Sequence, residues 1–236
     1  MSRASRTLST VALVLNICLA VPAGAEQSPV VVELYTSQGC SSCPPADEIF
    51  SELDDRDDVI AIALHVDYWD YIGWKDEFGQ PAHAVRQRAY AAKAGRNSIY
   101  TPEMIVNGTT DIVGAKPMAL SKAIAEHQAK PLRTALLAQR NETALRIQAQ
   151  VPTGSVVPME IHVLRLFPAK NSEITRGENR GRIYTYKNIA HSWTVAGAWD
   201  GTAPLDMSVA IDGTDPVVVL VQEAGAGPII ASARLD

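Results

Sequence analysis

The chain has 236 residues, of which 47% are hydrophobic and 20% are charged, and its formal net charge at pH 7 is -5. This composition fits a packed globular protein and excludes a disordered or collagen-like polymer. The negative charge gives no reason to expect a nucleic acid as partner.

The first 25 residues are typical of an export signal. Arg3 and Arg6 give a positive start, an apolar run extends from Leu8 to Val21, and the Ala-Gly-Ala sequence at 23–25 has the small residues that a signal peptidase recognises. The apolar run is shorter than the roughly 20 residues needed to cross a bilayer. We therefore expect a mature chain that begins at Glu26, is periplasmic or secreted from a bacterium, and has no stable membrane span.

Removal of this segment leaves two of the three cysteines, because Cys18 lies within the apolar run. The remaining pair, Cys40 and Cys43, is separated by two serines. An even pair of cysteines in an exported protein normally forms a disulfide. Two thiolates are too few for a structural zinc site of four thiolates.

The cysteine pair lies between two predicted strands. Residues 30–35 are β-branched and apolar, which predicts a buried strand. Pro44 and Pro45 suit the first turn of a helix, where backbone N–H groups have no partner within the helix. Residues 59–66 form a second apolar run, typical of a strand that is covered on both faces. Strand, helix and strand at this spacing predict a parallel βαβ unit with the cysteines at the start of its helix.

A long connection and a hairpin follow. Residues 67–100 begin with an aromatic, acidic stretch and contain a predicted helix from about Pro81 to Ala94. Residues 101–108 predict a strand that opens with Thr-Pro and ends in an Asn-Gly turn, paired with a short strand at 111–113. A further helix begins at Lys116 and Pro117. Its predicted buried face consists of Leu120, Ala123, Ile124 and His127.

The remainder of the chain has the pattern of an all-β structure. Apolar residues alternate with polar ones over 145–151, which predicts a strand with one buried face. Further predicted strands are Met159 to Phe167, Arg182 to Asn188, His191 to Ala196, Met207 to Ile211, Val217 to Gln222 and Ile229 to Leu235. Seven short strands without an intervening helix indicate a β-sandwich.

The order of the N-terminal elements resembles the thioredoxin fold: strand, Cys-x-x-Cys at a helix start, strand, inserted helix, Thr-Pro, hairpin and helix. The sequences at 33–46, 65–70 and 176–182 are similar to an uncharacterised family of secreted bacterial proteins with a thioredoxin-like N-terminal domain. The resemblance implies an α/β thioredoxin-like domain over 26–131, with an insertion at about 67–100, followed by an all-β sandwich-like domain over 132–236. It implies a fold and no particular substrate.

Cysteines at a helix start favour thiol-disulfide exchange, which needs an attacking thiolate, a resolving thiol and access for a partner. The partial positive charge and the free N–H groups of a helix N-terminus stabilise a thiolate. We expect Cys40, the outer residue, to attack and Cys43 to resolve. The expected partners are protein thiols or disulfides, and no dissociable cofactor is needed.

Four further residues are candidates for this site. The resemblance implies a cis peptide between Thr101 and Pro102 that faces the disulfide and leaves the Thr101 backbone free to pair with a substrate. Trp69 either borders a peptide groove or packs the insertion against the domain. Glu33 is a charged residue in an otherwise apolar strand, where an unpaired carboxylate is unfavourable. It is close to where thioredoxins keep a carboxylate that moves protons for the inner cysteine, and a salt bridge is the alternative.

Two other functions stay open. His65 or Asp67 could join Cys40 and Cys43 in a metal site, most plausibly for Cu(I), which soft thiolates favour; a hydrogen-bonded core histidine is the alternative for His65. The chain could instead be a non-catalytic binding or assembly protein in which the disulfide only stiffens a loop. Separately from these functions, the loop at 176–182 either binds an anion or a partner or is a solvated turn.

Overall fold

The computed structural model describes residues 28–131, 133–151 and 157–236. The predicted export signal and the expected start at Glu26 lie outside these residues. The helical elements are α1 (Pro44–Ser51), the 3-10 turns Glu52–Asp55 and Asp70–Ile72, α2 (Pro81–Lys93) and α3 (Pro117–Gln128). The strands are β1 (Val30–Thr36), β2 (Val59–His65), β3 (Glu103–Val106), β4 (Thr110–Val113), β5 (Ala135–Arg140), β6 (Ala144–Gln150), β7 (Met159–Ile174), β8 (Arg182–Trp199), β9 (Leu205–Ala210), β10 (Val217–Glu223) and β11 (Ile229–Leu235).

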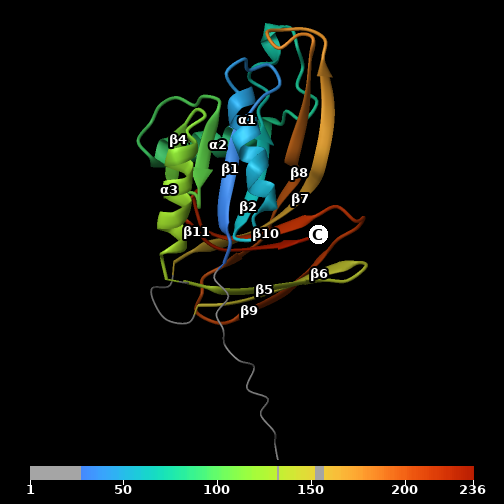
Figure 1. The fold of residues 1–236 in the computed structure, drawn as a ribbon. Coiled ribbons are helices and arrows are strands. Elements are labelled where there is room, and N and C mark those ends of the chain that lie inside the picture. The colour runs from blue at the N-terminus through green and yellow to red at the C-terminus, as the bar shows by residue number, and fades with distance from the viewer. Residues whose placement is uncertain (1–27, 132, 152–156) are drawn as a thin grey trace, which may run out of the picture.

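One mixed sheet of eight strands forms the centre of the molecule, in the order β11-β10-β7-β8-β2-β1-β3-β4 (Figure 1). β1 and β2 pair in parallel, as the βαβ prediction requires, and β3 and β4 form the predicted hairpin. β2 also pairs in parallel with β8, at Ala63 and Ile189. This contact joins the strands of the N-terminal half to those of the C-terminal half.

Helices cover both faces of the N-terminal part of this sheet. Val30, Val32 and Leu34 of β1 point to the face covered by α1 and α3, where they join one hydrophobic core. Residues at alternate positions, such as Val31 and Tyr35, join a second core on the face of α2. Each strand residue therefore has a defined side, because successive side chains of a strand point to opposite faces. The buried face predicted for α3 is confirmed.

A second sheet of three strands, in the order β5-β6-β9, packs against the large sheet. A third core fills the space between them, with Leu145 and Ile147 from β6 and Val217, Val219 and Val221 from β10. The alternate β10 residues belong to the core on the other face. β10 is thus buried on both faces, as its unbroken apolar sequence requires.

The predicted fold class, an α/β thioredoxin-like domain followed by an all-β sandwich-like domain, is wrong. The described residues form eleven strands and three α-helices, and β1 to β4 have no sheet of their own. Local patterns identified the βαβ unit correctly, but a pattern does not show which strand occupies the free edge of β2. That edge is taken by β8, so the fold is mostly β around one mixed sheet. The domain boundaries themselves stay a prediction.

The predicted strands at 159–167, 182–188 and 191–196 are too short. β7 continues to Ile174 and β8 is unbroken from Arg182 to Trp199. The paired ends of β7 and β8 beyond Ala169 and Lys187 form a two-stranded ribbon that reaches the upper end of α1 in Figure 1. In the described part of the chain, no helix has the length and apolarity to cross a membrane.

Candidate thiol-disulfide site

Cys40 and Cys43 form a disulfide at the start of α1, with their Cα atoms 5.4 Å apart. Cys43 is the N-cap residue of α1, and the backbone N–H groups of Ala46 and Asp47 donate to its carbonyl at 2.8 and 3.1 Å. Ser41 and Ser42 between the cysteines are exposed. Both cysteines are buried, and Cys40, with 3% of its surface exposed, is the less enclosed of the two.

Trp69 links the cysteine loop to the predicted substrate-binding residues. Its indole N–H donates to Thr101 Oγ1 at 2.7 Å, and a Cβ at Gly39 would lie 3.2 Å from the Trp69 Cβ. The peptide between Thr101 and Pro102 is cis, as the resemblance implied, and Pro102 is buried. The structure therefore connects Thr101 and Trp69 to the residue just before Cys40.

The tip of the β7–β8 ribbon closes over the cysteine loop. The Asn179 side-chain amide donates to the carbonyls of Gln38 at 2.9 Å and of Cys40 at 3.0 Å, and Asn179 is buried. The buried Gln38 side chain accepts from Trp74 Nε1 at 2.7 Å and donates to Ser172 Oγ at 3.0 Å. The loop is therefore held by the insertion on one side and by the ribbon on the other.

Replacing Asn179 with alanine is expected to speed reduction of the Cys40–Cys43 disulfide by dithiothreitol. The variant loses two buried hydrogen bonds, each with a net contribution of about 0.5–1.5 kcal/mol. If the closed loop is about 1.4 kcal/mol less stable relative to the open one, the disulfide is reduced about tenfold faster. Timed alkylation followed by mass spectrometry measures this rate. The control is Asn171→Ala, because exposed Asn171 lies on the same ribbon and bonds Thr185 instead; equal rates in both variants would rule out a closing role for Asn179.

Glu33 lies on the α2 face of the sheet and not on the face of α1. Its buried carboxylate accepts from Arg86 Nε at 2.7 Å and from the Tyr90 hydroxyl at 2.7 Å. Arg86 also donates to Tyr90 and to Gln222. Glu33 therefore forms a salt bridge with Arg86, which is the alternative to the predicted proton transfer with Cys43.

His65 is a buried histidine between aromatic rings. Its Nδ1 lies 2.8 Å from Asp76 Oδ2, and the ring meets Phe78 and Tyr186 edge-on. Burial raises the pKa of Asp76, but the charge and hydrogen bond of His65 and the N–H groups of Gln38 and Phe78 lower it below its usual value. Within 28–131, 133–151 and 157–236, no three His, Cys, Asp or Glu residues come together as a set that could hold a metal, so the Cys40, Cys43 and His65 alternative gains no support.

A groove of about 530 Å³ lies between α1 and β8, next to the disulfide. Pro44 and Pro45 line it from α1, and Tyr184 and Tyr186 line it from β8. Asp47 also lines the groove and accepts from Thr36 Oγ1 at 3.1 Å. Burial raises the pKa of Asp47 to about 7, although the His65 charge and the Thr36 hydrogen bond oppose the rise. The groove therefore contains a carboxyl group that gains and loses its proton near neutral pH.

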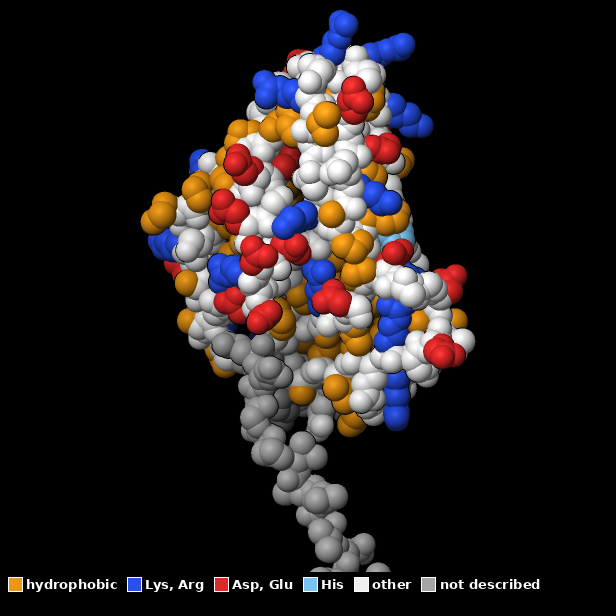
Figure 2. Space-filling view, turned by 45° about the vertical axis from the view of Figure 1, so that its right-hand side comes forward, with side chains coloured by type: hydrophobic (Ala, Val, Ile, Leu, Met, Phe, Trp, Pro, Cys, Tyr) orange, Lys and Arg blue, Asp and Glu red, His pale blue; other side chains and the backbone are white. Residues whose placement is uncertain are grey.

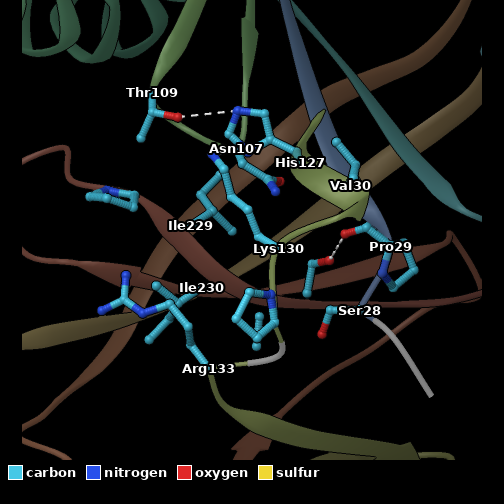
Figure 3. A pocket seen from close by; sticks show the side chains of 14 residues that line it. Ser28, Pro29, Val30, Asn107, Thr109, His127, Lys130, Arg133, Ile229 and Ile230 are labelled. Atoms are coloured by element: carbon cyan, nitrogen blue, oxygen red, sulfur yellow. Dashed lines mark hydrogen bonds between the residues drawn. The ribbon is translucent and has the colours of Figure 1, made fainter. Parts of the chain in front are cut away.

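A different cavity, of about 190 Å³, lies at the other end of β1 (Figure 3). His127, Lys130 and Arg133 line it together with residues that precede β1. His127 Nε2 lies 3.4 Å from Thr109 Oγ1, the contact drawn in Figure 3. β1 has seven residues, so this cavity is about 20 Å from the disulfide end of the sheet.

Sequence reasoning found the cysteine pair but missed Asp47, Gln38 and Asn179. Asp47 follows Cys43 by four residues, a spacing that puts both on one side of a helix and could have identified it. The loop at 176–182 was singled out, but its sequence did not indicate that Asn179 bonds the cysteine loop, because the two partners are 141 and 139 residues away.

Comparison with known proteins gives a family and two similar structures. Residues 31–222 match the family described as "Protein of unknown function (DUF1223)". The crystal structure of protein AGR_C_4864 from Agrobacterium tumefaciens is 26% identical, with a TM-score of 0.76 over 89% of this chain and 95% of that one. HBP35 of Porphyromonas gingivalis is 14% identical, with a TM-score of 0.63 over 89% and 75%, and shares the fold alone. No curated protein matches the chain.

Proposed function

The chain belongs to the family described as "Protein of unknown function (DUF1223)", and we propose that it is an exported thiol-disulfide oxidoreductase whose redox pair is Cys40 and Cys43. The observation that carries the proposal is the disulfide at the N-terminus of α1, with Cys43 as its N-cap. A helix N-terminus stabilises a thiolate through its partial positive charge and its free N–H groups. The proposal rests on this local arrangement and needs no particular fold class.

The exchange begins on the disulfide of the oxidised protein. A thiolate of a partner dithiol attacks Cys40 Sγ, the Cys40–Cys43 bond breaks, and Cys43 leaves as a thiolate that takes up a proton. The second partner thiolate then attacks the partner sulfur of the mixed disulfide and releases Cys40. Two electrons have passed from the partner dithiol to the cysteine pair. A second protein disulfide accepts them when the reaction runs in reverse.

Asp47 is our candidate for the group that exchanges the proton of Cys43. Its backbone N–H bonds the Cys43 carbonyl, and burial raises the pKa of its carboxyl to about 7. A proton carrier is most effective when its pKa is close to the working pH. Glu33 is paired with Arg86 on the α2 face of the sheet, and His65 is paired with Asp76.

The test is catalysis of insulin reduction and of the refolding of scrambled ribonuclease by the purified protein. Cys43→Ser should trap mixed disulfides through Cys40, because the resolving thiol is absent. Cys40→Ser should trap them less well, because Cys43 is fully buried. A wild-type protein as inactive as both variants would overturn the proposal.

The burial of both cysteines favours a second candidate, a binding or assembly protein in which the disulfide holds the loop in place. The hydrogen bonds from Asn179 to the loop suit this role equally well. A redox titration separates the two. A reduction potential below about -300 mV is typical of a structural disulfide and would support this candidate over the first.

A further inference from the structure

Three arginines at the tip of the β7–β8 ribbon have no acidic partner. Arg176 and Arg180 lie in the connection between the strands, and Arg182 is the first residue of β8. All three are exposed, and none has a carboxylate oxygen within 4.0 Å among residues 28–131, 133–151 and 157–236. Seven other arginines of the described residues do pair with a carboxylate. They are Arg56, Arg86, Arg96, Arg133, Arg146, Arg165 and Arg234.

The ribbon holds these charges beside the disulfide. Asn179, next to Arg180, bonds the Cys40 carbonyl, and Arg182 lines the α1–β8 groove together with Pro44 and Pro45. Figure 2 shows basic side chains projecting at the end of the molecule where the ribbon meets the start of α1. Glu178 is the one acidic residue of the connection. The tip thus carries a local positive charge on a chain whose net charge is negative.

We propose that Arg176, Arg180 and Arg182 form a docking surface for an acidic polypeptide segment that carries the thiol or disulfide reacting with Cys40. This inference rests on the proposed function and names the class of its partner. Exposed guanidinium groups bind carboxylates in a bidentate manner. Charges this close to the disulfide also raise the local concentration of an acidic partner and its rate of association.

The groove favours a polypeptide over an anionic membrane as the occupant. It has a volume of about 530 Å³ and is lined by two prolines, Asp47 and Glu48 on α1 and by two tyrosines, Arg182 and Lys187 on β8. A recess of this size accepts side chains. A flat lipid surface would meet the arginines but would not fill the recess.

The experiment uses two synthetic peptides of equal length, each with one cysteine, flanked by glutamates in one and by lysines in the other. The readout is the second-order rate at which each thiol opens the Cys40–Cys43 disulfide. We expect the acidic peptide to react at least tenfold faster at 10 mM salt. The difference should disappear at 1 M salt, where the Debye length is about 3 Å and charges that lie further apart are screened.

Charge reversal locates the effect. The variant R176E/R180E/R182E should prefer the basic peptide. The matched control, K122E/K130E/R133E, has the same change in net charge away from the ribbon: Lys122 lies on α3, and Lys130 and Arg133 line the cavity at the other end of β1. It should retain the preference for the acidic peptide. An equal response of the two triple variants would overturn the docking surface.

Insulin reduction with dithiothreitol, an uncharged reductant, separates this inference from the proposed function, because it needs no acidic peptide. If catalysis of insulin reduction is present but wild-type protein reacts equally with both peptides, the docking surface is wrong and the oxidoreductase proposal stands. If no catalysis is found, the oxidoreductase proposal fails whatever the peptide preference. Binding to phosphatidylglycerol vesicles that R176E/R180E/R182E loses, without any peptide preference, would assign the arginines to a membrane surface and overturn the inference.

Discussion

Replacing Arg86 with methionine is expected to destabilise the folded protein by roughly 3–5 kcal/mol, because it leaves the Glu33 carboxylate buried without its counter-charge. Glu33 is fully buried, and Arg86 Nε donates to it at 2.7 Å. The Arg86 guanidinium also lies over the Trp193 ring, 4.1 Å from its centroid. At about 2–4 °C per kcal/mol for a chain of this size, the loss corresponds to a fall in Tm of roughly 6–20 °C. Thermal unfolding followed by circular dichroism measures it.

The matched control is Arg146→Met. Arg146 pairs with Asp206 through two hydrogen bonds, at 3.0 and 2.6 Å, but both side chains are about half exposed. An exposed pair contributes at most about 1 kcal/mol. The double variant E33Q/R86M should recover part of the loss, because the buried charge is removed together with its partner. Equal Tm values for R86M and R146M would show that the buried pair does not stabilise the fold.

The Glu33 pair shows how far sequence reasoning reached. An acid within an apolar strand indicated either proton transfer or a salt bridge, and Glu33 forms a salt bridge with Arg86. Arg86 is 53 residues away on α2, so no local spacing connects the two. The predicted proton transfer by Glu33 stays testable with Glu33→Gln. If Glu33 serves that role, the variant changes the pH profile of disulfide exchange, whereas the salt-bridge role changes only the free energy of unfolding.

The ribbon shows where local rules misled. Pro168 predicts a strand end, because proline cannot donate to the ladder. In the structure the pairing skips Pro168, between the Phe167–Ile189 and Ala169–Lys187 pairs, and opposite it Asn188 takes a positive φ of 51°. The strands then continue toward the cysteine loop. The cysteine pair could be predicted from local residues, but the cover over it depends on this tertiary pairing and could not.

β5 was missed for a related reason. Its residues, Ala135–Arg140, have Leu136 and Leu137 in succession and so lack the alternation that identified β6. β5 is an edge strand that pairs only with β6 in its sheet, and its burial is partial. A strand of this kind is specified by its neighbour more than by its own sequence.

Asp47→Asn is expected to stabilise the protein at pH 8 and to leave its stability unchanged at pH 4. Burial raises the pKa of Asp47 from 3.8 to about 7 in the folded state. The folded state therefore holds this proton more tightly than the unfolded state does, and wild-type stability falls as the pH rises from about 4 to 7. Full ionisation of such a carboxyl costs up to about 4 kcal/mol. Partial exposure of the side chain reduces this cost to roughly 2 kcal/mol.

Asparagine removes this cost because it keeps an oxygen that can accept from Thr36 Oγ1 and has no proton to lose in this range. The expected gain in Tm at pH 8 is roughly 4–8 °C. The control is Glu48→Gln, the same change of charge at the next, exposed residue of α1. Thermal unfolding of the three proteins from pH 4 to 9 measures the effect. A gain that is the same at pH 4 and pH 8, or one that Glu48→Gln reproduces, would show that the Asp47 carboxyl is not held protonated by burial. Asp47 could then not serve as the proton carrier for Cys43 near neutral pH.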